Sequence, residues 1–222
     1  MCRAKARREK GPMNSYSLPV ICVAAAASLV ATAQSASGAI ITFSQQFVWE
    51  FYSQNQGAAL SLETFNSYSG FYTNPLTGSV GGVNWSATAP GGLFVGAVGG
   101  SPALSTINPT TLALSFAGAP LQGVGGRFFA TNVTFNVVPA IVTLALQDGS
   151  SFVGLVTDAA AFTGFYSTGA AITSISIAAQ APPGGSGDVF PTVDDLRFAV
   201  IPAPGAIALL GVAGLVGFRR RR

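Results

Sequence analysis

Few side chains in this 222-residue chain have the types and spacing that acid-base or metal chemistry requires. Glu50 and Glu63 are a candidate glycosidase pair, because such an enzyme needs one carboxylic acid and one carboxylate at a matched separation. Asp194 and Asp195, with Glu63 or Asp188, are candidate ligands for Ca²⁺, which prefers carboxylate oxygens. The alternation of a strand puts neighbouring side chains on opposite faces, so any one site would include only one of the two aspartates. Their alternative role is turn capping or a hydrogen bond to an arginine.

A second group of candidates is aromatic. Pyranose CH groups pack on flat aromatic faces, so tryptophan and tyrosine side chains could form a sugar-binding platform, and packing in the core is their alternative. The candidates are Trp49, Trp85, Tyr68, Tyr72 and Tyr166.

Two residue types are missing where catalysis would need them. The chain has no histidine, and no lysine follows Lys10. This excludes Ser-His-Asp and Cys-His catalysis, histidine-ligated zinc, and Schiff-base or P-loop chemistry. We therefore predict that the protein is not an enzyme and has no cofactor other than, at most, Ca²⁺.

The elements that must position these residues are mostly short strands. Phe43, Phe47, Val48 and Phe51 follow a helical stripe, which predicts a short helix at Ser44 to Tyr52. Downstream the hydrophobic period changes to two, with β-branched and aromatic residues between clusters of Gly, Pro, Asn and Ser. The predicted strands are Ser61 to Phe65, Val83 to Ala87, Leu93 to Val98, Thr111 to Phe116, Gly123 to Ala130, Ile141 to Gln147, Ser151 to Thr157, Phe162 to Ser167, Ile172 to Ala178 and Asp194 to Val200.

About ten strands at this spacing predict an all-β protein, a jelly-roll-like β-sandwich with a short N-terminal helix. Asp148 and Gly149 join two of the strands as a hairpin. Glycine-rich stretches such as Gly91-Gly92, Gly99-Gly100 and 184–187 are expected to be flexible loops. Ser, Thr, Gly and Ala occupy most outward positions, so the surface should carry little charge.

The N-terminal residues 1–39 have the order of a secretory signal peptide: basic residues, an apolar run, then small residues. Cleavage between Ala39 and Ile40 is preferred because strand-like sequence starts at Ile40, and cleavage after Ala33 is the alternative. Translation could start at Met1 or at Met13. Cys22 follows an apolar segment as a lipidated cysteine would, but bulky residues precede it.

The C-terminal residues 201–222 combine a Pro-x-Pro break, an apolar run from Gly205 to Phe218 and four arginines. As a helix the run would be about 21 Å long, which is short for a hydrocarbon core of about 30 Å. Snorkelling arginines and local thinning of the bilayer would let it span, with the arginines cytoplasmic and the preceding domain outside. We therefore predict a transient inner-membrane anchor.

The two ends also account for most of the positive charge. Between Ile40 and Val200, two arginines stand against seven acidic residues, a formal charge of −5. This argues against nucleic acid as a partner, because phosphate binding needs a basic surface. Both cysteines lie before residue 40, so the domain 40–200 must be held together without disulfides.

The C-terminal pattern resembles the sorting signal of PEP-CTERM proteins. The matching residues are Pro202, Ala203, Pro204 and Gly205, followed by the terminal Arg219, Arg220, Arg221 and Arg222. The resemblance implies recognition and cleavage near the prolines by an exosortase-like membrane protease. Ala203 stands where that family usually has glutamate.

The exported part is similar to a recurrent exported domain of the same family. The matching segments are Glu63 to Phe65, a Leu-Gln-Asp-Gly hairpin at Leu146 to Gly149, a Phe-x-Gly-Phe turn at Phe162 to Phe165, an Ile-Thr-Ser-Ile-Ser strand at 172–176, and Asp194 to Phe198. The fold that this resemblance implies is a sandwich like that of carbohydrate-binding modules.

Three functions follow from the sequence as hypotheses. The first is a non-enzymatic exported protein of the cell envelope or extracellular matrix, sorted through its C-terminal signal and retained in the envelope or secreted. The alternative is a module that binds extracellular polysaccharide. The third is a glycoside hydrolase, which has the least support because nothing in the sequence indicates that Glu50 and Glu63 converge.

Overall fold

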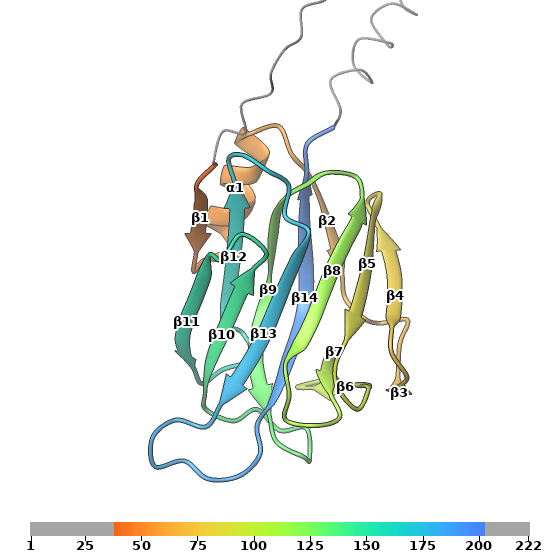
Figure 1. Ribbon diagram of the computed structural model, residues 1–222, viewed down its shortest axis with the longest axis vertical. Helices are drawn as coiled ribbons and strands as arrows, with labels where there is room; N and C mark the ends of the chain where they lie inside the picture. Colours follow the sequence, from red (N-terminus) through yellow and green to blue (C-terminus); the bar gives the residue numbers. More distant parts are fainter. Residues whose placement is uncertain (1–37, 203–222) are drawn as a thin grey trace, which may run out of the picture. The chain divides into compact units, whose positions relative to one another are not determined.

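A computed structural model describes residues 38–202 of the chain. Within them the chain forms one α-helix and fourteen β-strands in two facing sheets (Figure 1). The prediction of an all-β sandwich with a short N-terminal helix is confirmed. Most of the predicted signal peptide and nearly all of the predicted sorting segment lie outside the described residues. No helix within 38–202 is long and apolar enough to cross a membrane.

The larger sheet has eight antiparallel strands, seven of them in the order β1-β12-β9-β14-β7-β6-β3. β14 is central: β9 pairs along one side of it, and β7 and then β2 pair along the other. The strands are β1 (Ile40–Phe43), β12 (Phe162–Ser167), β9 (Leu121–Thr131), β14 (Phe190–Val200), β7 (Ser101–Thr106), β6 (Leu93–Val98), β3 (Gly70–Tyr72) and β2 (Ala59–Glu63).

The smaller sheet has six antiparallel strands in the order β11-β10-β13-β8-β5-β4. They are β11 (Ser151–Val156), β10 (Ala140–Leu146), β13 (Ser174–Gln180), β8 (Leu112–Gly118), β5 (Val83–Thr88) and β4 (Leu76–Val80). β10 and β11 form the predicted hairpin, and the carboxylate of Asp148 in its turn accepts the Ser150 N–H at 2.9 Å.

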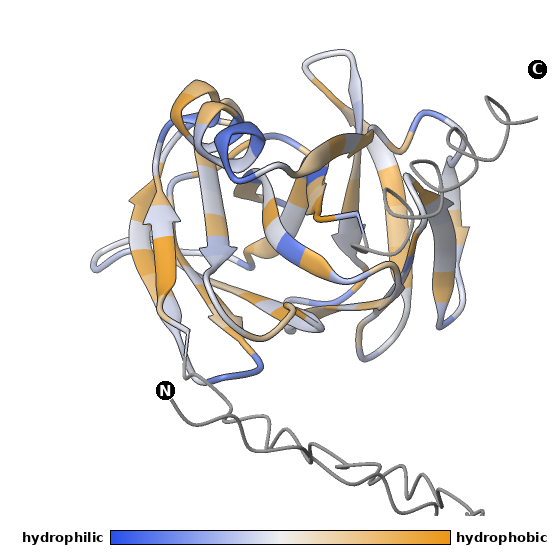
Figure 2. Ribbon diagram, turned by 90° about the horizontal axis from the view of Figure 1, so that it is seen from above, coloured by the Kyte–Doolittle hydropathy of each residue, from blue (hydrophilic) through white to orange (hydrophobic). Residues whose placement is uncertain are grey.

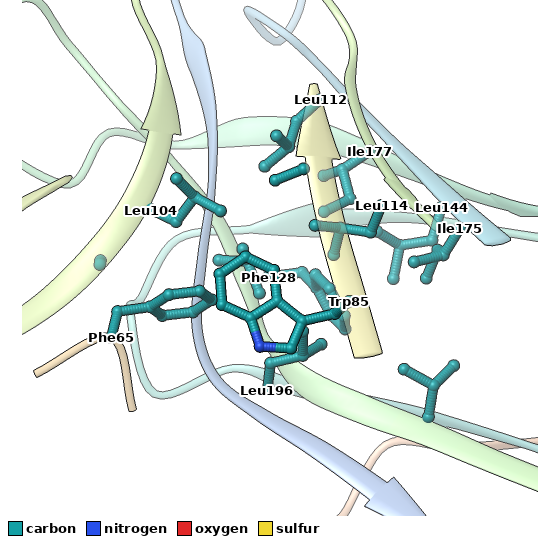
Figure 3. Close-up of a cluster of buried hydrophobic side chains, with 14 of the residues drawn as sticks. Phe65, Trp85, Leu104, Leu112, Leu114, Phe128, Leu144, Ile175, Ile177 and Leu196 are labelled. Atoms are coloured by element: carbon teal, nitrogen blue, oxygen red, sulfur yellow. The ribbon is translucent and has the colours of Figure 1, made fainter. Parts of the chain in front are cut away.

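The core lies between the sheets and follows the alternation of each strand. Ile175 and Ile177 of β13 point inward, as do Leu112 and Leu114 of β8, and all four are at most 1% exposed. They meet side chains of the larger sheet such as Phe128 and Leu196 (Figure 3). Burying each such side chain contributes about 1.5–3 kcal/mol, which has to hold the domain together without a disulfide.

The helix α1 (Gln46–Asn55) packs on the outer face of the larger sheet, meaning the face turned away from the smaller sheet. Its Trp49 is fully buried and donates its indole N–H to the carbonyl of Phe165 at 3.0 Å. Trp49 also lies against Phe162, with ring centroids 6.0 Å apart. One side of α1 is thereby fixed to β12 and β9.

The structure corrects several predicted elements. The helix begins and ends later than Ser44 to Tyr52. All ten predicted strands are present, two of them with the predicted ends and the others with boundaries shifted by a few residues. β1, β3, β4 and β7 complete the sheets. Phe162 to Phe165, a turn in the family resemblance, belongs to strand β12, as the hydrophobic pattern predicted. Gly99-Gly100 is the tight turn of the β6-β7 hairpin.

Candidate functional site

The outer face of the larger sheet carries an aromatic pocket. Phe71, Phe94 and Phe135 form a row in it, with ring centroids 4.8 Å and 5.1 Å apart. The first pair is tilted by 49°, and the second is nearly perpendicular at 81°. Phe71 is 75% exposed and Val133, at the rim, is 84% exposed. Apolar side chains are thus presented to solvent beside a cavity of about 260 Å³.

Strand register positions the first two rings. β3 pairs with β6 so that Phe71 lies directly opposite Phe94. Leu93 and Val95 point into the core, so the alternation of β6 turns Phe94 outward. Directly opposite side chains on one face are close enough for aromatic rings to touch.

The third ring comes from the β9-β10 loop. The Asn132 amide oxygen accepts hydrogen bonds from the N–H groups of Thr134 and Asn136, both at 3.0 Å, and from the Thr134 hydroxyl at 2.8 Å. This folds the loop back over the sheet and holds Phe135 at a φ of 63°. Gly96 lies beneath it: a Cβ there would come within 3.1 Å of the Phe135 ring and 2.6 Å of Phe94. A side chain at this position would therefore displace the Phe94 or the Phe135 ring from the row.

Fully buried hydroxyl groups lie beneath the floor of the pocket. Thr192 donates to Ser105 at 2.9 Å and lies 3.1 Å from the Thr131 hydroxyl, and Ser105 bonds the carbonyl of Pro191 at 3.1 Å. None of the residues lining the pocket is charged: they are Phe71, Phe94, Ser105, Thr106, Ile107, Thr131, Asn132, Val133, Phe135 and Phe190. Apolar surface with a few polar groups is the usual composition of a small-molecule site.

A second hollow continues from the first. Asn132 and Val133 line both, so Val133 forms a ridge between them. The second hollow has a volume of about 570 Å³ and is bounded by the glycine-rich loop 181–189, with Asp188 as its one charged residue. Two adjoining hollows give room for successive units of a chain molecule.

The aromatic residues proposed from the sequence lie elsewhere. Trp49, Trp85 and Tyr166 are at most 2% exposed, which is the core role given as their alternative. Tyr68 is half-buried beside Phe65 and Trp85, and Tyr72 is half-buried beside Tyr68. Tryptophan and tyrosine go inside because their polar atoms find partners there: the Trp85 indole N–H, for example, donates to Glu63 at 3.0 Å.

The sequence patterns do not single out the site phenylalanines. Phe71 falls in a segment of three paired residues, too short for a periodicity to show. The one available indication was Phe94, whose outward position follows from the alternation of the predicted strand Leu93 to Val98.

Glu50 and Glu63 do not form a pair. Glu50 on α1 binds the Arg197 guanidinium at 3.2 Å on the outer face. Glu63 lies opposite the buried Leu196, on the inner side of the sheet, where it accepts from Trp85 and from the Phe65 N–H at 2.9 Å. Each carboxylate has a structural role on a different side of the sheet.

The expectation that Asp194 and Asp195 point to opposite faces is wrong. A β-bulge in β14 places one extra residue opposite β9 between Asp194 and Arg197, and Asp195 adopts a φ of 50°. The bulge turns the Asp195 carboxylate to Arg127 at 3.2 Å and to Arg197 at 3.7 Å. Asp195 thus forms ion pairs with two arginines, one of which is Arg197, the residue named in its alternative role.

These carboxylates are not assembled as a metal site. Within residues 38–202, no three Asp, Glu, His or Cys side chains are grouped closely enough to hold an ion. Asp194 is 4% exposed, and burial raises the pKa of its carboxyl group, while hydrogen bonds from Ser101 and the Asp195 N–H and the charge of Arg127 lower it. A carboxylate that is already costly to ionise fits a structural role.

The residues at the two ends of the described part adjoin the larger sheet. Ala39 accepts the Thr168 N–H at 3.1 Å, and Ile40 is the first residue of β1, paired with Ser167. Pro202 follows the last strand by two residues. Ala203, Pro204, Gly205 and Arg219 to Arg222 lie outside the described residues, so the sorting signal stays a prediction from sequence.

Comparisons with other proteins give little support for a family. The chain matches no protein-family model and none of the curated proteins searched. Among solved structures it is similar to a mutant family 29 carbohydrate-binding module in complex with mannohexaose. The TM-score is 0.33 and the identity 11%, over 64% of this chain and 92% of that chain. A similarity this low establishes neither a shared ligand nor a shared site.

Proposed function

We propose that the domain is a non-catalytic module that binds a polysaccharide chain in the aromatic pocket. The observation that carries the proposal is the row of Phe71, Phe94 and Phe135 next to buried hydroxyl groups. The apolar CH faces of a sugar ring can pack on exposed aromatic rings, and Phe71 of this row is 75% exposed. The adjoining hollow beyond Val133 gives room for further sugar units.

The charge of the site points to a neutral polysaccharide. The aromatic pocket has no charged side chain, and the adjoining hollow contributes only the carboxylate of Asp188. A uronic acid or sulfated polymer would find no cation there to pair with. The same lining supports a binding role over hydrolysis, because it holds no acid and nucleophile pair.

The test is polysaccharide binding by the secreted chain and by two matched variants. Phe71→Ala removes a ring of the pocket, whereas Phe47→Ala removes an equally exposed phenylalanine from α1, since both are 75% exposed. Affinity electrophoresis in gels that contain neutral glucans, mannans or alginate measures the affinity directly. We expect binding to at least one neutral polymer and at least about a tenfold loss in Phe71→Ala only, equivalent to about 1.4 kcal/mol.

Two results would contradict this function. One is an absence of binding to every neutral polymer by the wild-type chain. The other is equal binding by wild type and Phe71→Ala. Hydrolysis of any of these polymers, measured as released reducing ends, would instead revive the glycosidase hypothesis.

We also propose that the module is exported and held at the membrane until an exosortase-like protease processes its C-terminal signal. Support comes from the order of features in residues 1–39 and 201–222, and from Pro202 following the folded domain directly. A chain that lacks Arg219 to Arg222 should lose the membrane-retained precursor and appear unsorted in the medium. Unchanged cell fractionation of that truncation would overturn this part of the proposal.

A further inference from the structure

The helix α1 presents an apolar face that the described domain leaves uncovered. Phe47, Val48 and Phe51 are 75%, 42% and 57% exposed, whereas Trp49 and Ser53 on the opposite side are fully buried. The Phe47 and Phe51 rings stack on each other with centroids 6.3 Å apart. Figure 2 shows hydrophobic residues on the part of this helix that points away from the sandwich. Contiguous exposed apolar side chains of this size commonly mark an interaction surface.

The exposed face carries no net charge. Glu50 is the one charged residue in α1, and Arg197 neutralises it at 3.2 Å. The polar residues that flank the phenylalanines are amides, Gln46, Gln54 and Asn55. Such a face can approach a lipid surface without desolvating an unpaired charge.

The helix also lies where the chain leaves the domain. β14 ends at Val200, and Ile201 packs against the small cluster that contains Trp49 and Ala199. Gly205, the first residue of the apolar run, is four residues beyond Ile201. Four residues span at most about 14 Å when fully extended, so the run must begin close to α1.

We propose that the Phe47, Val48 and Phe51 face of α1 rests in the headgroup region of the bilayer that holds residues 205–218. This inference rests on the proposed membrane stage of the chain and is independent of sugar binding. Amphipathic helices bury an apolar face about 5–10 Å into the boundary between headgroups and acyl chains. The short tether brings α1 to this depth once the apolar run is in the membrane.

The docked helix would also orient the binding site. α1 and the end of β14 lie at one end of the sandwich, and β3, which carries Phe71, lies at the other (Figure 1). The aromatic pocket opens on the same outer face of the larger sheet as α1, so a docked α1 would leave the pocket at the far end of that face and not on the opposite face.

Spin labelling tests this directly, because the chain's only cysteines are at positions 2 and 22. In a full chain with both replaced by serine, a nitroxide is attached to Phe47→Cys or, as the matched control, to the equally exposed Phe71→Cys. The proteins are reconstituted in phosphatidylcholine vesicles and floated. Collision of each label with lipid-soluble oxygen and with a water-soluble nickel complex is then measured.

The expected result is an oxygen-to-nickel collision ratio at position 47 at least about threefold that at position 71, as for a side chain in the membrane interface. A floating chain whose two labels have the same aqueous ratio would overturn the inference alone. A label at 47 shielded from both reagents would overturn it too, because protein would then cover the face, either a second copy or the chain's own apolar run. A chain that does not float would overturn the anchor as well, whatever the outcome of the polysaccharide experiment.

Discussion

At the scale of single residues, burial of a charged group alters its pKa and so makes the stability of the domain depend on pH. The Asp194 carboxyl is 4% exposed and accepts the N–H of Asp195 at 2.7 Å. Its burial removes the carboxylate from water, and this outweighs the hydrogen bonds and the nearby Arg127 in setting its pKa, which is raised from 3.8. The folded state therefore holds the Asp194 proton more tightly than the unfolded state does.

This gives a pH-dependent prediction. A raised pKa in the folded state means that the contribution of Asp194 to stability is fully present below about pH 4 and is lost as pH rises through the folded pKa. The substitution Asp194→Asn puts a neutral amide in place of the carboxyl group and keeps an acceptor for the Asp195 N–H. The difference in free energy of unfolding, variant minus wild type, should therefore increase as pH rises above about 4.

Urea denaturation between pH 4 and 8 measures this difference. Asp158→Asn is the control, because Asp158 is exposed and likewise accepts a backbone N–H, that of Ala160 at 2.8 Å. We expect a smaller pH-dependent change for this control. A difference between Asp194→Asn and wild type that is flat with pH, or that falls as pH rises, would show that burial is not what governs this carboxyl.

Contacts of single residues also explain why the positions of the carboxylates were easier to predict from the sequence than the positions of the aromatic side chains. The places of Glu50 and Glu63 on a helix and a strand give no sign of convergence, and the two residues lie on different sides of the sheet. A tryptophan or tyrosine side chain can be buried only where its N–H or O–H finds a hydrogen-bond partner. Trp49 finds that partner 116 residues away in the chain, at Phe165, which no local pattern can reveal.

At the scale of elements, α1 is seated on a patch of glycines. Gly164 of β12 and Gly123 of β9 lie under the helix, and a Cβ at Gly123 would come within 3.1 Å of the Trp49 ring. A Cβ at Gly164 would come within 2.5 Å of the Trp49 ring, which is fully buried. The helix can therefore approach the sheet only because a side chain is missing there.

Gly164→Ala is accordingly expected to destabilise the domain by about 1–3 kcal/mol, the usual cost of overpacking. The midpoint of urea unfolding measures the loss. Gly154→Ala is the matched control on β11: there the Cβ would meet the end of the half-buried Phe152 ring at 2.8 Å, which can swing aside. Equal losses in the two variants would mean that Trp49 is not held rigidly against the sheet.

The β9-β10 loop gives a second prediction at this scale. Asn132→Ala removes the acceptor of three hydrogen bonds and should release Phe135 from the pocket. We expect about a tenfold loss of polysaccharide affinity with little change in global stability, because the loop residues Val133, Thr134 and Asn136 are exposed and contribute little to the core.

Amide hydrogen exchange at Thr134 and Asn136 reports on the loop itself and should speed up in Asn132→Ala. Asn132→Asp retains the acceptor oxygen and should keep both amides protected. Unchanged exchange in the alanine variant would mean that other contacts hold Phe135 in place.

Elements were predictable in proportion to their length and periodicity. Leu93 to Val98 and Phe162 to Ser167 agree with β6 and β12 at both ends. β7 reads Ser-Pro-Ala-Leu-Ser-Thr, with a proline and few β-branched residues, and forms because β6 and β14 flank it. Tertiary pairing overrides local propensity in such strands. The bulge at Asp195 has the same origin, since it exists only against β9.

At the scale of the whole molecule, the last strand completes the fold. β14 runs through the middle of the larger sheet and pairs with β9, β7 and β2. It also supplies fully buried side chains to the core, Val193, Leu196 and Phe198. β1 likewise pairs with β12, so both ends of the domain depend on residues distant in the chain. Such non-local pairing makes the fold cooperative and slow to form.

This topology limits where the chain can be processed. β14 ends at Val200, so cleavage near Pro202 to Pro204 leaves every strand of both sheets in place. Cleavage before β14 would remove the central strand of the larger sheet. A chain that ends at Pro204 should therefore keep the urea midpoint and the polysaccharide affinity of the full chain. A chain that ends at Asp188 should show neither cooperative unfolding nor binding, because β9, β7 and β2 would lose their shared partner. Near-UV circular dichroism with urea titration distinguishes the two, and a marked loss of stability in the chain ending at Pro204 would mean that the sorting segment contributes to the folded domain.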